Sequence, residues 1–299
     1  MNFSTVTTID EALAALAAGA RPIAGGSDLM VGHRQGKAPL PDSVVAIDRV
    51  ADLGHVVQHP DGVSVGALVS HHTIEFHPTL VQLYTGLADA SALVGSPSTR
   101  HVGTLGGNVM NASPAMDTGA PLLVLGAEVE LRSVRGSRRV ALADLWIGPG
   151  RTSASTDELC VAIHLPTRPP SSGSAYVRLE YRRAMEIAVV GAAASVTLAG
   201  DGTITRIAVA LTAVAPTIVG IDGLDDLIGR PVDEPLLADI AHRASDQARP
   251  ISDLRATDTY RRHCIGIMAR RSVDAAIRRA LGQHIAVPVN RALGIGAAS

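Results

Sequence analysis

The sequence predicts an α+β fold, with a two-part first domain and a C-terminal sheet-and-helix domain. Up to residue 54, a capped helix and short apolar strands predict a small α/β unit. From Val56 to Leu165 apolar residues recur with period two, which predicts a mainly antiparallel sheet unit. Beyond a linker, two strands precede two long helical patterns. The predicted domains are 1–170 (parts about 1–54 and 55–170) and 175–285, with a tail at 286–299.

The α/β unit begins with a helix that the sequence caps at both ends. Thr8 with Glu11 three residues later is a capping box, and Gly19 is placed to end the helix. A strand over 22–24 then leads into Gly25-Gly26, where Ser27 and Asp28 suit the start of another helix. A second buried strand is expected over 44–47.

The sheet unit begins with a hairpin, because Pro60-Asp61-Gly62 is a turn sequence between two period-two runs. One helix is expected over 79–94, and alternating strands over 128–132 and 159–165. Proline and small polar residues make 167–174 the best linker. The C-terminal domain is then read as strands over 192–198 and 204–211 and helices over 234–249 and 258–281, and the last dozen residues as a disordered tail.

Composition excludes several classes of function. A formal net charge of −2 argues against a nucleic-acid partner, and no apolar run reaches the length of a membrane span, so we expect a cytoplasmic protein. Cys160 and Cys264 are the two cysteines; an iron–sulfur cluster normally needs four, so buried structural thiols are expected. His71-His72 has no further ligand at metal spacing and is taken as a loop pair, so no metal site is predicted.

Two glycine pairs are the candidates for a binding site. One lies in Thr104-Leu105-Gly106-Gly107-Asn108 and the other in the stretch 23–30, around Gly25-Gly26. Glycine loops let an anion approach backbone N–H groups, so two such turns could converge on one diphosphate. Neither matches the dinucleotide or P-loop motif, and either alone is more often a plain turn.

Five motifs taken together resemble one family, the flavin-binding medium subunit of molybdenum hydroxylases, as in carbon monoxide dehydrogenase and xanthine dehydrogenase. They are AGGSDLM at 24–30, TLGGNVMNASPAMD at 104–117, IHLP at 163–166, YRRAMEIAVVGAAA at 181–194 and SDLRATDTYRRH at 252–263. The resemblance covers nearly the whole chain. It implies an FAD-binding fold, bound FAD, and partner subunits that carry [2Fe-2S] clusters and molybdopterin.

The resemblance also implies which residues bind FAD. Those implied to line the pyrophosphate are Ala24, Gly25, Gly26, Ser27, Asp28 and Leu29 on one side, and Thr104, Gly106, Gly107 and Asn108 on the other. Asp117 matches an acid at the ribose or adenine end, and Ser113 lies in the same segment. A plain alternative for Asp117 is the N-cap of a helix.

Near the flavin ring the resemblance places Ile187 against the ring, with Leu165 and Arg178 close by. Met185-Glu186 stands where the xanthine dehydrogenase branch has two acids, which leaves the electron acceptor open. Arg182 and Arg183 are otherwise read as a solvated charge pair. No catalytic residue is assigned, because the primary substrate would bind a partner.

The function implied is electron transfer. FAD would receive electrons from the iron–sulfur small subunit of a complex with a molybdopterin large subunit, built as a dimer of heterotrimers, and pass them to an external acceptor. Two alternatives remain open: a self-contained flavin-dependent oxidoreductase, and a non-redox nucleotide-binding scaffold subunit.

Overall fold

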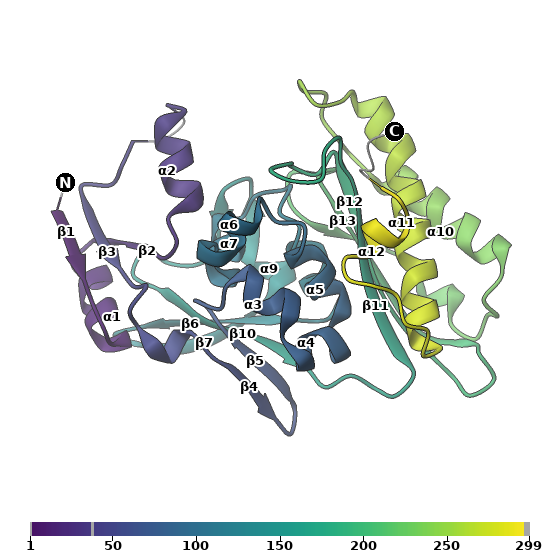
Figure 1. Ribbon diagram of the computed structural model, residues 1–299, viewed down its shortest axis with the longest axis horizontal. Coiled ribbons are helices and arrows are strands. Elements are labelled where there is room, and N and C mark those ends of the chain that lie inside the picture. The colour runs from purple at the N-terminus through teal and green to yellow at the C-terminus, as the bar shows by residue number, and fades with distance from the viewer. Residues whose placement is uncertain (1, 37–38, 296–299) are drawn as a thin grey trace. The chain divides into compact units, whose positions relative to one another are not determined.

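The computed structural model describes residues 2–36 and 39–295, and it divides into two compact units (Figure 1). Unit 1 comprises 1–73, 97–112 and 127–167, and unit 2 comprises 74–96, 113–126 and 168–299. Each unit therefore combines segments that are far apart in the chain. The consecutive domains expected from the sequence stay a prediction. Mixed helix and sheet in both units confirms the α+β class.

Unit 1 begins with a three-stranded parallel sheet, in the order β1 (Asn2–Thr5), β3 (Ser43–Ala46), β2 (Arg21–Ile23). Helix α1 (Ile9–Ala17) buries Leu13 and Leu16 in the core of this part. The predicted capping box is confirmed: Thr8 accepts a hydrogen bond from the Glu11 N–H, and the Glu11 carboxylate accepts one from the Thr8 N–H. Helix α2 (Ser27–Arg34) follows the turn at Gly26 and has no buried residue.

The second part of unit 1 is a five-stranded sheet in which every neighbouring pair is antiparallel. Its order is β4 (Val56–His59), β5 (Gly62–Gly66), β10 (Leu159–Pro166), β6 (Glu128–Ser133), β7 (Gly136–Ala141). The predicted hairpin and both alternating strands are confirmed. Shorter elements of this unit are η1 (Ala51–Leu53), α6 (Pro97–Val102), α7 (Leu105–Asn111), α9 (Leu142–Leu145), β8 (Trp146–Gly148) and β9 (Arg151–Thr152), and α3 (His71–Phe76) begins in it.

Unit 2 is a four-stranded antiparallel sheet with helices on both faces (Figure 1). The strands are β11 (Ser172–Leu179), β12 (Val190–Leu198), β13 (Ile204–Thr212) and β14 (Val219–Gly220), in that order. On one face, α10 (Glu234–Gln247) and α11 (Asp258–Ala280) share a core with Ala175 and Val177. Because α5 (Thr85–Ser91) and α8 (Gly119–Val124) also pack on the sheet, β12 is buried along its whole length. Short 3-10 helix η2 (Asp225–Leu227) precedes α10.

Three expectations about unit 2 are wrong. The single helix expected over 79–94 is two, α4 (Pro78–Leu83) and α5, because Tyr84 leaves the helical region at φ −129° and ψ 44°. The second half of the expected linker is strand, since Ser172 already pairs with Thr197. Part of the expected disordered tail is ordered: α12 (Val289–Ala292) buries Val289 and Asn290. Residues 296–299 of that tail lie outside the described residues.

A buried ion pair holds the end of the chain in unit 2. The Asp89 carboxylate, which is fully buried, pairs with the guanidinium of Arg279 on α11. It also accepts hydrogen bonds from the backbone N–H of Tyr176 at 3.2 Å and of Val289 at 3.0 Å. Asn290 adds two hydrogen bonds to the backbone of Arg178. One carboxylate therefore connects α5, β11, α11 and the first residue of α12.

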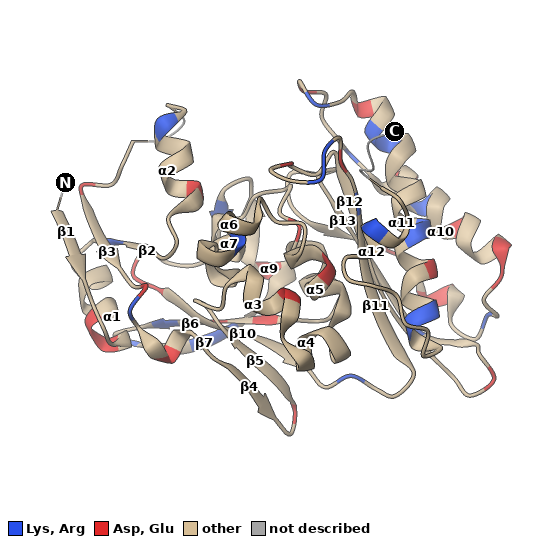
Figure 2. Cartoon of the chain, in the orientation of Figure 1, with Lys and Arg blue, Asp and Glu red and all other residues tan. Residues whose placement is uncertain are grey.

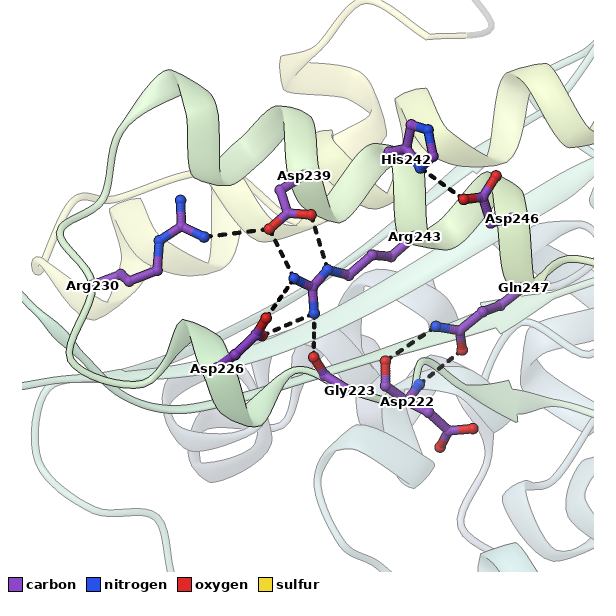
Figure 3. Close-up of polar contacts among 9 residues, drawn as sticks. All are labelled: Asp222, Gly223, Asp226, Arg230, Asp239, His242, Arg243, Asp246 and Gln247. Atoms are coloured by element: carbon purple, nitrogen blue, oxygen red, sulfur yellow. Dashed lines mark hydrogen bonds and ion pairs between the residues drawn. The ribbon is translucent and has the colours of Figure 1, made fainter.

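A second charged network lies on the surface of unit 2 (Figure 3). Arg243 of α10 is held between Asp226 at 2.8 Å and Asp239 at 2.9 Å, and it also donates to the Gly223 carbonyl. Both α10 and α11 carry basic and acidic residues (Figure 2), with acids predominating on α10 and arginines on α11. Among the described residues, no helix is long and apolar enough to cross a membrane.

Candidate functional site

Gly25 of the first glycine pair lies directly against residues 102–103, which precede the second glycine motif. A Cβ placed on Gly25 would lie 1.8 Å from the carbonyl oxygen of Val102 and 3.3 Å from the N atom of Gly103. Any side chain at residue 25 would therefore collide with the 102–103 peptide. Gly26 next to it has φ +67°, which other residues rarely adopt. The sequence thus brings the two motifs together within unit 1, as the convergence of two turns on one ligand requires.

Gly106 and Gly107 are not in a loop, contrary to expectation. They lie in the first turn of α7, whose N-cap is Thr104. The Gly106 N–H donates to the Ala67 carbonyl at 2.9 Å, the Gly107 N–H to Thr104 Oγ1 at 3.1 Å, and the Asn108 N–H to the Thr104 carbonyl at 3.0 Å. These donors are therefore used inside the protein, the first by pairing with residue 67 and the other two by the N-cap residue Thr104. The expected supply of free N–H groups from this motif is therefore wrong.

Helix α2 supplies donors instead. The N–H groups of its first turn, at Ser27, Asp28 and Leu29, have no partner within the helix, whereas that of Met30 bonds to the Gly26 carbonyl at 3.0 Å. Such a terminus favours an anion through both its hydrogen bonds and its dipole. Asp28 is exposed to solvent, and partial desolvation of its carboxyl raises the pKa of that group.

Asp117 lies in a buried polar cluster of unit 2. Its carboxylate accepts a hydrogen bond from the Tyr176 hydroxyl at 2.8 Å and pairs with Arg178 at 2.6 Å. Arg178 also pairs with Glu180 at 2.7 Å. The N-cap alternative for Asp117 is wrong, because Thr118 holds that position in α8. Burial and the nearby Asp117 charge raise the pKa of Tyr176, and Asp117 and Glu180 raise that of Arg178.

The residues expected near a flavin ring differ in exposure. Leu165 and Arg178 are buried side chains, whereas the side chain of Ile187 is 54% exposed. Ser113 is half-buried, and its hydroxyl accepts a hydrogen bond from the Ala115 N–H. In the segment 181–187, Arg182 donates to the Met185 carbonyl at 2.7 Å and pairs with Glu186 at 3.3 Å. Arg182 is thus an exposed but paired arginine.

Sequence reasoning missed Tyr176, Glu180 and His71. Tyr176 lies between buried apolar residues of β11 and Glu180 directly follows that strand, so the only signal was a polar residue in or next to a buried strand. His71 is 1% exposed and begins α3, so the loop expected there is wrong. Both cysteines are buried, as expected, and burial raises the pKa of Cys160 to about 12. The described part of the chain holds no group of three side chains suited to a metal.

Comparison with known proteins decides the family. Residues 1–168 match the family described as the FAD binding domain in molybdopterin dehydrogenase, and 175–276 match the CO dehydrogenase flavoprotein C-terminal domain. The chain belongs to this flavoprotein family. It is an FAD-binding subunit of the carbon monoxide and xanthine dehydrogenase type, and hence part of an oxidoreductase.

Individual relatives agree over most of their length. The flavoprotein is 32% identical over 262 residues to the carbon monoxide dehydrogenase medium chain of Afipia carboxidovorans, covering 87% of this chain and 90% of that one. It is 28% identical over 269 residues to the putative xanthine dehydrogenase FAD-binding subunit of Escherichia coli, covering 88% and 91%. A chain of the carbon monoxide dehydrogenase structure from Hydrogenophaga pseudoflava superposes with a TM-score of 0.89 at 26% identity, over 93% of this chain and 98% of that one.

The residues of this flavoprotein suit the diphosphate of FAD. A diphosphate needs several donors, which the first turn of α2 provides, and the absence of a side chain at Gly25 lets the start of this turn lie against the 102–103 peptide. A Cβ at Gly25 would collide with that peptide and displace the start of α2. FAD on this chain therefore agrees with both the family and the local geometry.

Proposed function

We propose that this flavoprotein carries electrons between subunits of a molybdenum hydroxylase. Its FAD receives them from [2Fe-2S] clusters of an iron–sulfur small subunit and passes them to an external acceptor. A molybdopterin large subunit hydroxylates the substrate, in a cytoplasmic dimer of heterotrimers. The medium chains of carbon monoxide dehydrogenase among the relatives support this division of labour. Bound FAD supplies a carrier that holds one or two electrons.

The observation that carries the proposal is the contact of Gly25 with the 102–103 peptide. It joins two of the motifs that mark the family, at the start of a helix whose first N–H groups are free of helical partners. We propose that the FAD-binding residues are Ala24, Gly25, Gly26, Ser27, Asp28, Leu29, Thr104, Gly106, Gly107, Asn108, Ser113, Asp117, Leu165, Arg178 and Ile187.

In this proposal the two groups of residues around the diphosphate act differently. The first turn of α2 donates hydrogen bonds to phosphate oxygens. Gly106 and Gly107 contribute through their small size, because their N–H groups already bond within the protein. The Thr104 hydroxyl accepts from Gly107 through its oxygen, so its proton remains available to donate.

The segment 181–187 would face the electron acceptor. Its acid, Glu186, pairs with Arg182 and accepts a hydrogen bond from the Ile187 N–H at 3.1 Å. Met185 is 58% exposed, so the rim of the proposed ring site is apolar at this point. Because the Glu186 carboxylate is paired with Arg182, it would repel an anionic electron acceptor less than an unpaired carboxylate would.

The direct test of the site compares Gly25→Ala with Gly32→Ala. A Cβ at Gly32, on the same helix α2, meets no atom within 4 Å. We expect Gly25→Ala to weaken FAD binding at least about a hundredfold, or about 2.7 kcal/mol, and Gly32→Ala to leave it unchanged. The measurement is flavin absorbance per protein after gel filtration, with titration of FAD. Equal retention by both variants would refute the site.

The electron-transfer role is tested separately, by mixing the FAD-loaded chain with a reduced iron–sulfur small subunit of this enzyme family. We expect bleaching of the flavin absorbance only when that subunit is present. Bleaching by a small organic substrate alone would instead favour a self-contained flavin enzyme.

A further inference from the structure

His71 is a buried histidine beside the proposed diphosphate site. It is 1% exposed, and its ring lies under Gly103, since a Cβ there would be 3.3 Å from His71 Cδ2 and 3.8 Å from Nε2. The same 102–103 peptide meets Gly25. His71 and Gly25 therefore both contact the peptide that joins the two glycine motifs.

The backbone of this region is fastened as well. The His71 N–H donates to the Gly103 carbonyl at 3.1 Å, and Ser70 and Thr104 form an antiparallel bridge. The Leu105 N–H donates to the Val69 carbonyl at 3.0 Å. Neighbouring imidazoles add a second connection, because the rings of His72 on α3 and His101 on α6 lie with centroids 3.9 Å apart. The start of α3 thus fixes where the 102–105 segment runs.

The His71 ring acts through its shape and not through a buried hydrogen bond at Nδ1. Within the described residues, Nδ1 is buried and has no hydrogen-bond partner. Burial, with a smaller effect of the Arg100 charge, lowers the pKa of His71 to about 4, so the ring is neutral at pH 7. A neutral ring without a partner at Nδ1 costs stability, which an apolar residue of this size would avoid.

We propose that His71 is a positioning residue for FAD: its ring supports the 102–104 segment, so that Gly25 and the first turn of α2 are correctly placed for the diphosphate. This inference rests on the proposed FAD site. The ring itself does not touch the cofactor, and its effect reaches FAD only through the backbone of residues 102–104.

The experiment compares three variants of the full-length chain. His71→Ala removes the ring, His71→Phe keeps a neutral ring, and Leu131→Ala removes a fully buried side chain elsewhere in unit 1. We expect His71→Ala to raise the Kd for FAD at least about tenfold and to shift the phosphorus NMR signals of bound FAD. His71→Phe should stay within about threefold of the wild-type Kd, because ring shape is retained.

Leu131→Ala is the control for stability. It should lower Tm at least as much as His71→Ala while leaving the Kd and the phosphorus signals unchanged. If His71→Ala does not yield folded protein, His71→Gln, which also lacks the ring, replaces it with the same expected direction. Wild-type Kd and phosphorus signals in the ring-less variant would overturn the inference, as would equal losses in His71→Phe and His71→Ala.

The two proposals fail in different ways. If Gly25→Ala retains FAD, the diphosphate site itself is wrong. If Gly25→Ala loses FAD while ring-less His71 variants bind it normally, the site stands and only the role of His71 is wrong.

Discussion

Helix α11 of unit 2 and helix α2 of unit 1 differ in how much tertiary packing stabilises them. Over 23 residues, α11 buries apolar side chains such as Ile265 and Val273 in the core, and its Arg279 pairs with buried Asp89. Over 8 residues, α2 buries none, and Met30 and Val31 are exposed. The long helix is therefore stabilised by tertiary packing, whereas the short one has little packing of its own.

This difference separates the framework from the binding element. Elements with few buried contacts open at low free energy, and ligand-binding segments are often of this kind. A ligand that binds only the ordered form stabilises it by mass action. We therefore expect unit 2 to be folded with or without FAD, and α2 to gain order from it.

The largest expected effect is a loss of stability of unit 2. Asp89→Ala leaves Arg279 buried without its carboxylate and removes the acceptor of two backbone N–H groups. Loss of one partner of a buried pair costs about 3–5 kcal/mol, so the free energy of unfolding of unit 2 should fall by that amount. Urea denaturation followed by circular dichroism measures it.

Asp157→Ala is the matched control for Asp89→Ala, because Asp157 pairs with Arg135, whose side chain is 64% exposed. Exposed pairs contribute little, so this variant should unfold close to wild type. Equal unfolding of the two variants would show that burial of the Asp89 pair is unimportant.

Acid should act on unit 1 through His71. Its pKa is about 4 when folded and 6.5 in the unfolded chain, so between these values the unfolded chain binds a proton that the folded chain does not. Stability should therefore be unaffected by this group above pH 6.5 and fall by about 3 kcal/mol as pH drops from 6.5 to 4. Urea titrations across this range should give a flatter profile for His71→Phe; parallel profiles would contradict the assignment.

The elements of the framework were largely predictable because their signals are local. The capping box of α1, the Pro-Asp-Gly hairpin and the apolar periodicity of α10 and α11 each lie within a short stretch. The break at Tyr84 was not predictable, because apolar residues continue through it. Order in the tail was hidden too, since it depends on Asp89, 200 residues away, accepting from Val289.

The site was predictable only in part. The glycine pairs predicted where two backbone segments approach each other closely, and Gly25 does lie against the 102–103 peptide. That the Gly106 N–H is already used depends on pairing with Ala67, which no local pattern reports, whereas the Gly107 and Asn108 N–H groups bond to the nearby N-cap residue Thr104. The contact of Asp117 with Tyr176 and Arg178 spans about sixty residues and joins a loop to a strand, so it too required the fold.

Hydrogen exchange would sharpen the comparison of α2 with α11. With FAD at about 100 times its Kd, mass action stabilises the bound form by about 2.7 kcal/mol, so exchange in the first turns of α2 should slow up to about a hundredfold. Exchange in the middle of α11 should slow less, because its packing in the core of unit 2 already orders it without FAD. Uniform slowing of both helices would mean that FAD stabilises the whole chain as one unit.

The smallest expected effect concerns the surface network around Arg243. The two aspartates hold the pKa of Arg243 above its usual range, and Arg243 holds those of Asp226 and Asp239 below theirs. Asp226 is 63% exposed, so water and salt weaken its pairing with Arg243.

Arg243→Gln should lower Tm by less than Asp89→Ala does, and the loss of Tm should shrink at about 0.5 M salt. Arg271→Gln, at an exposed arginine of α11, is the control and should leave Tm unchanged. A loss for Arg243→Gln as large as that for Asp89→Ala, and insensitive to salt, would mean that this network belongs to the framework of unit 2.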